Sequence, residues 1–300
     1  MLKLAAPLIV GSSEEWFLKN RRGDEYVVQI GFPRNWADYT PAPDEPGVPI
    51  IYLTDGNSVF LTALDALHRR LSLDEPTFPT GIVVAIGYPI PAGSKKVYDT
   101  PRRCWDLTPA APGAKETEGG ADELIEFIQN RVKPLVRQRV AETRGVIVGK
   151  EALYGHSFGG LFCLHTLFTR PYTFDCFIAS SPSIWWHDEY LVKEEATFRR
   201  KHAEGTTKQK PSLMMFAGGQ EEDPPRRRGE GDEEYENRRR DHQGWRMVNN
   251  MREMSGRLET SGCFENFSSH VYEGEDHGTV AACSLSRGLT TFFEDWPFRI

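Results

Sequence analysis

The sequence predicts an α/β fold in which a mostly parallel, doubly wound sheet carries helices on both faces. Residues 49–53 and 81–86 are continuous runs of apolar residues, as in strands that are covered on both faces. Residues 122–140 carry apolar side chains at a helical period. Runs of these two kinds alternate to the end of the chain, which is the order of elements typical of this fold class.

The first elements are expected to form one edge and the centre of the sheet. Residues 16–18 and 26–32 have the pattern of two antiparallel strands, joined by a turn at 22–24. The runs at 49–53 and 81–86 then supply central parallel strands. The helix at 122–140 is expected to be kinked by Pro134, which cannot donate a backbone hydrogen bond.

The second half of the chain repeats the pattern of strands and helices. Strands are expected at 151–154, 175–180, 212–217 and 267–272, and helices at 161–168 and 284–293. No Gly/Ser-rich linker divides the chain, so the sequence predicts a single domain over residues 1–300.

A dense run of mixed charges at 222–243 interrupts this pattern and is expected to be an exposed insertion. It contains two arginine triplets, at 226–228 and 238–240, with acidic residues between them. Such a run is ordinarily a solvated loop or a frayed helix. The functional alternative is a mobile lid whose arginines lie over an anionic substrate.

The composition limits the class of protein. Hydrophobic residues make up 39% of the 300, which indicates a sizeable core, and the net charge of −7 gives no basic field for nucleic acid. The five cysteines are an odd number without metal-site spacing, so they are expected to be reduced thiols, and no metal site is predicted. No stretch reaches the roughly 18 apolar residues of a membrane helix. The apolar patch at 2–10 lacks a cleavage motif, so a cytoplasmic protein without a membrane partner is expected.

The most informative segment is Gly155-His156-Ser157-Phe158-Gly159, which fits the nucleophile elbow Gly-x-Ser-x-Gly. It lies between a predicted strand and a predicted helix, as the elbow requires. The two glycines allow strand and helix to approach each other at a tight turn. The segment therefore predicts Ser157 as an attacking hydroxyl.

In an α/β-hydrolase the partners of the serine follow in the order acid, then histidine, each on a loop after a strand. His277 follows the last predicted strand and precedes the last helix, so it is the candidate general base. Glu221 follows the strand at 212–217 and is the preferred acid. Glu222 and Asp223 remain alternatives, as does a dyad that lacks an acid.

A tetrahedral intermediate needs two backbone N–H donors. The residue after the nucleophile, Phe158, supplies the first. The second is expected from the loop after the strand at 49–53, with Gly56 or Asn57 as the donor. Asp55 in the same loop is expected to brace it rather than to react.

Seven segments resemble, in order, the motifs of one branch of the α/β-hydrolases. They are residues 53–57, 102–109, 119–121, 155–162, 180–186, 218–221 and 274–278. The branch is that of the ferric-siderophore esterases of the enterobactin and salmochelin type, with the related fungal esterases acting on triacetylfusarinine C. The resemblance implies hydrolysis of a siderophore ester by Ser157 and His277, with iron released as the ligand is fragmented.

The family's arginine motif corresponds to Arg102 and Arg103, which implies contact with an anionic chelate. Guanidinium groups match such oxygen-rich surfaces through paired hydrogen bonds. The alternative is that one of these arginines braces Asp106. Trp105, Trp185 and Trp186 are expected to wall the pocket that holds this chelate. The alternative is that they pack in the core or in loops without a binding role.

Together these observations predict a serine esterase that cleaves a siderophore, of the fusarinine-type hydroxamate class, to release intracellular iron. The chemistry needs no cofactor, and the expected partner is the small-molecule substrate alone. Two alternatives stay open: a general carboxylesterase or thioesterase acting on small acyl donors, and a non-catalytic binder of a ferric chelate. The oligomeric state is not predicted.

Overall fold

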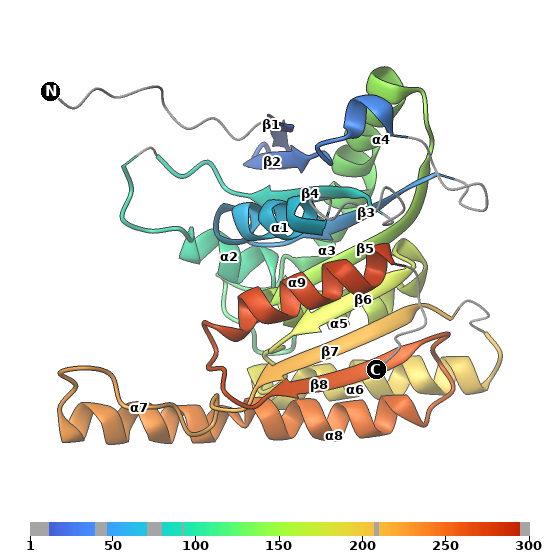
Figure 1. Ribbon diagram of the computed structural model, residues 1–300. Coiled ribbons are helices and arrows are strands. Elements are labelled where there is room, and N and C mark those ends of the chain that lie inside the picture. The colour runs from blue at the N-terminus through green and yellow to red at the C-terminus, as the bar shows by residue number, and fades with distance from the viewer. Residues whose placement is uncertain (1–11, 40–46, 71–79, 92, 207–209, 295–300) are drawn as a thin grey trace, which may run out of the picture.

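The computed structural model describes residues 12–39, 47–70, 80–91, 93–206 and 210–294, and the apolar patch at 2–10 lies outside them. Eight strands form one sheet in the order β1-β2-β4-β3-β5-β6-β7-β8 (Figure 1). Their bounds are β1 Ser13–Lys19, β2 Glu25–Gly31, β3 Val48–Leu53, β4 Ile82–Gly87, β5 Val148–His156, β6 Cys176–Ser180, β7 Ser212–Gly218 and β8 Phe267–Tyr272. The pairs β1–β2 and β2–β4 are antiparallel and the other pairs are parallel, so the predicted fold class is confirmed.

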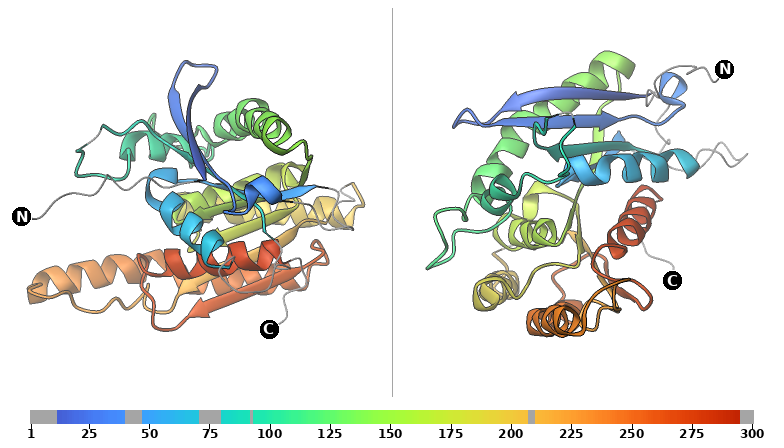
Figure 2. Two further views of the ribbon diagram at one scale, coloured as in Figure 1. Left: turned by 45° about the horizontal axis from the view of Figure 1, so that its top comes forward. Right: turned by 90° about the vertical axis from the view of Figure 1, so that its left-hand side faces the viewer.

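Helices cover both faces of the sheet, as the apolar strands require. Helices α1 (Gly56–Arg70) and α9 (Val280–Phe293) lie on one face, and α5 (Phe158–Thr169) and α6 (Trp186–Ala203) lie on the other (Figure 2). Each face has its own cluster of buried apolar side chains. Because strands β3 to β7 lie between these two clusters, both faces of each of these strands are apolar.

The helix predicted at 122–140 is built from three pieces. Helix α3 (Ala121–Phe127) passes through a π-helical turn at Ile128–Val132 into α4 (Lys133–Arg144). Pro134 stands in the first turn of α4, directly after the π-helical turn, and it has no N–H to donate to a carbonyl of the turn before it. The irregularity expected from Pro134 therefore lies in the turn before it.

A buried ion pair fixes the start of α4 to the sheet. The side chain of Lys133 is 2% exposed, and its Nζ lies 2.9 Å from Glu151 Oε2 and 2.5 Å from the carbonyl of Thr173. The Tyr52 hydroxyl donates to the other oxygen of Glu151 at 2.8 Å. Burial and the charge of Glu151 hold the pKa of Tyr52 well above its usual value, so the tyrosine remains a donor.

A second buried charge cluster joins α5 to its neighbours. His165 Nδ1 lies 2.9 Å from Glu194 on α6, and its Nε2 lies 3.9 Å from Asp122 on α3. Burial alone lowers the pKa of His165, but these two carboxylates outweigh burial and raise the pKa to about 9.

This cluster gives a testable dependence of stability on pH. A folded pKa above the unfolded value means that the stabilisation is fully present below about pH 6.5 and is lost as the pH rises toward about 9. The expected loss is on the order of 3 kcal/mol, because one pKa unit corresponds to about 1.4 kcal/mol. Urea unfolding of wild type and His165→Gln between pH 6 and 9 measures it. The difference in unfolding free energy between the two proteins is expected to shrink over that range, and parallel curves would contradict the assignment.

Candidate active site

The nucleophile elbow joins β5 to α5 at Ser157. This residue has φ 62° and ψ −118°, a strained backbone conformation for a non-glycine residue. A Cβ atom at Gly155 would overlap the carbonyl group of Gly159, and a Cβ at Gly159 would overlap the Thr54 hydroxyl. The glycines predicted for the elbow are thus required by two close approaches.

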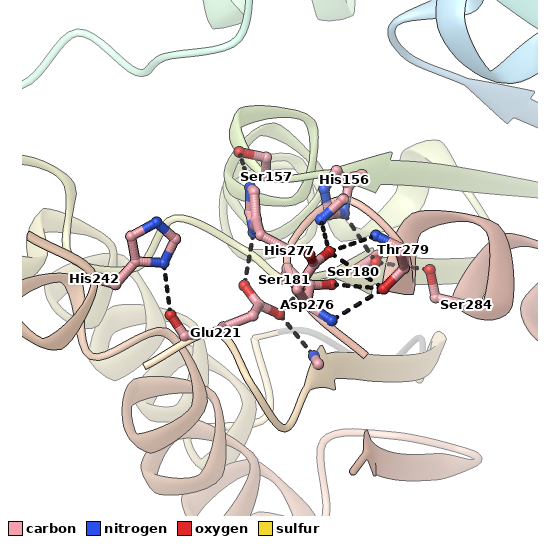
Figure 3. Close-up of polar contacts among 12 residues, drawn as sticks. His156, Ser157, Ser180, Ser181, Glu221, His242, Asp276, His277, Thr279 and Ser284 are labelled. Atoms are coloured by element: carbon pink, nitrogen blue, oxygen red, sulfur yellow. Dashed lines mark hydrogen bonds and ion pairs between the residues drawn. The ribbon is translucent and has the colours of Figure 1, made fainter. Parts of the chain in front are cut away.

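Ser157, His277 and Glu221 form one continuous hydrogen-bonded chain (Figure 3). The Ser157 hydroxyl lies 3.1 Å from His277 Nε2, and His277 Nδ1 lies 2.6 Å from Glu221 Oε2. These residues come from the ends of β5, β8 and β7, respectively, because parallel strands bring their carboxyl ends to one edge of the sheet. Geometry of this kind lets an imidazole accept a serine proton while a carboxylate holds its other nitrogen.

Glu221 is fully buried and held at both oxygens. Its Oε1 accepts from the backbone N–H of Gly218 at 2.6 Å and from the Ser181 hydroxyl at 2.5 Å, which leaves Oε2 for His277. The two alternative acids turn elsewhere: Glu222 accepts from Asn249, and Asp223 pairs with Arg239 at 2.6 Å. Of the three carboxylates, the structure places Glu221 at the imidazole.

A second histidine contacts His277 and has no counterpart among the predicted site residues. The rings of His156 and His277 lie 4.6 Å apart, and His156 Nδ1 lies 3.1 Å from the Ser180 hydroxyl (Figure 3). Burial, together with the charges of His277 and Arg103, holds the pKa of His156 well below its usual value. Because a neutral His156 places no like charge beside His277, an imidazolium formed there meets no extra repulsion.

The candidate oxyanion donors lie at two helix starts. Phe158 opens α5, while Gly56 and Asn57 open α1, and first-turn N–H groups have no intrahelical acceptor. The side chain of Asn57 anchors its loop to Tyr88, accepting from the backbone N–H at 2.7 Å and donating to the carbonyl at 2.9 Å. The donor roles of Phe158, Gly56 and Asn57 stay predictions.

Arg103 ties the loop before α1 to the elbow. It makes a bidentate ion pair with Asp55, at 2.7 and 2.9 Å, and its Nη2 also donates to the carbonyl of His156 at 3.3 Å. Asp55 therefore braces the loop, in the position expected for it. The Arg103 guanidinium lies 5.4 Å from the ring centre of Phe158, so it borders the elbow as well.

Arg102 lies away from the elbow. Its guanidinium stacks on the rings of Tyr26 and Tyr88, 4.3 and 4.8 Å from their centres, and donates to the carbonyl of Glu25. Its Nη2 is 4.0 Å from Asp106, the residue named as its alternative partner. These contacts are those of a bracing residue.

The three predicted tryptophans occupy different surroundings. Trp186 is 3% exposed and belongs to the core. Trp105 packs so closely on Gly120 that a Cβ there would overlap its indole, and Arg22 lies 4.8 Å above its ring. Trp185 is half-buried, and its ring lies 6.3 Å from that of Phe158 in the elbow. Of the three, Trp185 is the one in contact with the elbow.

The charged insertion forms a loop and then helix α7 (Asp232–Trp245), which projects from the body in line with α8 (Met247–Glu259) (Figure 1). Three of its six arginines pair with acids of the insertion: Arg226 with Asp232 and Arg238 with Glu230, both at 2.7 Å, and Arg239 with Asp223 at 2.6 Å. Residues 222–243 hold eight acidic residues against these six arginines, so the insertion as a whole carries negative charge. No residue of α7 is buried.

Among the residues that the structure describes, no group of three or more His, Cys, Asp or Glu side chains is arranged to hold a metal ion. In the same residues, none of the helices combines the length and the apolar character needed to cross a bilayer.

Comparison with known proteins gives consistent matches. Residues 20–247 match the family model "Esterase", described as "Putative esterase". The chain is 44% identical to "Siderophore triacetylfusarinine C esterase" of Aspergillus fumigatus over 97% of both chains. It is 36% identical to "Siderophore enterobactin esterase" of Emericella nidulans over 91% of both. Among solved structures, "Siderophore hydrolase EstB from Aspergillus nidulans" superposes with a TM-score of 0.89, at 47% identity and 99% coverage of both chains.

Proposed function

Because the chain belongs to the esterase family, whose model covers most of its length, we propose that it is a serine esterase that cleaves ester bonds of a siderophore. The observation that carries the proposal is the unbroken path from the buried Glu221 carboxylate through His277 to the Ser157 hydroxyl. Residues 1–300 act in this proposal as one catalytic domain.

The proposed reaction is acyl transfer in two steps. In the first, Ser157 attacks the ester carbonyl while His277 Nε2 takes the serine proton and passes it to the departing alkoxide. Glu221 stabilises the imidazolium through Nδ1–H. The N–H of Phe158, with that of Gly56 or Asn57, donates to the oxyanion. In the second step His277 takes a proton from a water molecule, which attacks the acyl group, and returns that proton to the Ser157 oxygen as the bond between this oxygen and the acyl carbon breaks.

Two features support a precise alignment of these groups. Arg103 and Asp55 lock the loop before α1 against the elbow, so the candidate oxyanion donors keep their position relative to Ser157. The contact with neutral His156 limits rotation of the His277 ring. Both contacts act before substrate binds, which lowers the reorganisation needed in the transition state.

For the substrate, we propose a hydroxamate siderophore of the triacetylfusarinine C type, with its bound iron as cargo. The relative named for that substrate is 44% identical over nearly the whole chain, against 36% for the relative named for enterobactin. Hydrolysis of the ester bonds would split the chelator into fragments that each offer fewer iron ligands. Such cleavage is expected to weaken iron binding, and the cytoplasm is the proposed location of the release.

A panel of substrates tests this function. Purified protein is incubated with ferric and iron-free triacetylfusarinine C, with enterobactin and with phenyl acetate, and the products are identified by mass spectrometry. We expect triacetylfusarinine C to be cut with one water added per ester, at a higher kcat/KM than enterobactin. Turnover of phenyl acetate without cleavage of either siderophore would indicate a general carboxylesterase. Quenching of tryptophan fluorescence by the ferric chelate without turnover of any ester would indicate a binding protein.

A further inference from the structure

The loop that carries the proposed acid is held on one side by the loop that carries the proposed base. This acid loop, residues 219–223, follows β7 and leads into the charged insertion. The backbone N–H of Gly219 donates to the carbonyl of Tyr272 at 2.8 Å, and that of Gln220 donates to the carbonyl of Glu275 at 3.0 Å. These bonds continue the pairing of β7 with β8 into the two loops, so the acid and the base are joined through their backbones.

On its other side the acid loop is held by helices α7 and α8. The Glu222 carboxylate accepts from the backbone N–H of Asn249 at 2.8 Å and from its side-chain amide at 2.7 Å. The Asp223 carboxylate pairs with Arg239 at 2.6 Å. The two carboxylates that chain order left as alternative acids thus anchor the acid loop. Both contacts are exposed to solvent, which weakens them.

A third contact from α7 reaches the buried acid itself. His242 Nδ1 donates to the backbone carbonyl of Glu221 at 2.8 Å (Figure 3). Glu221 is fully buried, and a hydrogen bond in such surroundings is electrostatically stronger than one at the surface. The His242 ring lies 4.9 Å from the ring of Trp245, which stacks on Trp185 at 5.6 Å with an interplanar angle of 18°. These ring contacts hold the orientation of the imidazole that donates to Glu221.

A bond to the Glu221 carbonyl controls where the Glu221 carboxylate lies. The carbonyl and the side chain leave the same Cα atom, so this bond fixes the backbone from which Oε2 reaches His277 Nδ1 at 2.6 Å. The other oxygen, Oε1, accepts from Gly218 and Ser181. A shift of the Glu221 backbone therefore either breaks the bonds at Oε1 or lengthens the bond to His277. A displacement of about 1 Å in an active site can lower the rate about 100-fold.

From these contacts we infer that His242 is a positioning residue for the proposed acid, and that the charged insertion serves to bring it to the acid loop. The inference rests on the proposed function, because Glu221 needs a fixed position only if it supports His277 during ester hydrolysis. In this assignment the insertion acts on the enzyme's own acid loop, and not as a lid over the substrate. Its helix α7 can then lie outside the core, since its task is to present one imidazole.

Steady-state hydrolysis of phenyl acetate tests the inference with two variants that divide the contacts of His242. His242→Phe keeps a ring against Trp245 and loses the donor, whereas His242→Asn keeps a donor near the position of Nδ1 and loses the ring. In His242→Phe we expect kcat to fall about 10- to 100-fold with KM within about twofold of wild type, and in His242→Asn we expect most of kcat to be recovered. Arg240→Ala is the control, because it removes an exposed side chain that bonds within the same helix, and it is expected to keep full kcat.

A double-mutant cycle separates positioning from a general effect on the fold. Because His242 acts through Glu221, His242→Phe is expected to lower kcat less than about twofold when it is added to Glu221→Gln. A general effect on the fold would lower kcat by the same factor in wild type and in Glu221→Gln. Such equal factors would refute the positioning role.

Proton NMR makes the test independent of turnover. A short hydrogen bond between an imidazole and a carboxylate, such as that of His277 Nδ1 with Glu221 at 2.6 Å, places its proton far downfield in the spectrum. We expect this resonance in wild type, His242→Asn and Arg240→Ala, and its loss or broadening in His242→Phe and Glu221→Gln. An unchanged resonance in His242→Phe would overturn the inference even where kcat had fallen. A wild type that hydrolyses neither phenyl acetate nor a siderophore would refute the proposed function and leave the NMR comparison valid.

Discussion

Replacing Ser157 with alanine is expected to lower kcat for phenyl acetate by about 10⁴- to 10⁶-fold. The hydroxyl is the proposed nucleophile, and its loss leaves only substrate binding and the oxyanion donors to accelerate hydrolysis. The side chain is partly exposed, so the free energy of unfolding is expected to stay within about 1 kcal/mol of wild type. Steady-state hydrolysis and urea unfolding of the same preparation measure both quantities.

A matched variant controls for nonspecific effects of removing a serine hydroxyl. Ser255 is buried in α8, and its hydroxyl donates to a carbonyl of its own helix, so Ser255→Ala is expected to keep full activity. Adding Glu221→Gln to Ser157→Ala is expected to cause little further loss, because the members of a catalytic chain act as a unit. Retention of a tenth of the wild-type rate by Ser157→Ala would rule out the serine mechanism.

Removing the buried ammonium of Lys133 is expected to destabilise the fold by about 3–5 kcal/mol. In Lys133→Met the Glu151 carboxylate keeps its buried position and loses its closest cation, at 2.9 Å. The ammonium also lies 4.0 Å from the ring centre of Phe174, a contact that methionine replaces only in part. Denaturant unfolding at pH 7 measures the loss.

Arg137 offers the control, because it pairs with the same oxygen of Glu151 at 3.1 Å but is 53% exposed. Arg137→Met is expected to cost less than about 1 kcal/mol, as is usual for exposed pairs. The double variant Lys133→Met/Glu151→Gln is expected to recover part of the stability lost in Lys133→Met, since no buried charge then remains unpaired. Equal costs for Lys133→Met and Arg137→Met would contradict the interpretation.

The central strands could be predicted because burial on both faces of the sheet requires continuous runs of apolar residues in the sequence. The run at 49–53 corresponds to β3 at Val48–Leu53, and the run at 81–86 corresponds to β4 at Ile82–Gly87. The π-helical turn at Ile128–Val132 could not be predicted, since the apolar period continues through it. Helix α7 gives no amphipathic signal, because none of its residues is buried.

In the site, the elbow motif and the order of the strands were enough to nominate Ser157 and His277 and to prefer Glu221, because parallel strands end at a common edge. The choice of Glu221 over Glu222 and Asp223 needed the side-chain contacts of the structure. Chain order could not select His156, His242 or Trp245, whose positions depend on ring contacts between elements distant in sequence. It also could not distinguish Arg103 from Arg102. These neighbours on one short helix, α2 (Thr100–Asp106), point to different partners, Asp55 and the ring of Tyr26.

The imidazole of His277 depends on the outermost strand of the sheet. Strand β8 lies at the edge, pairs with β7, and is half-buried to exposed along its length. Edge strands of this kind open at a lower free energy than the interior of a sheet. Partial detachment of β8 would carry the base away from the nucleophile while the interior strands stay paired. Hydrolysis therefore depends on β8 staying paired with β7. On heating, the activity is expected to be lost at a lower temperature than the circular dichroism signal.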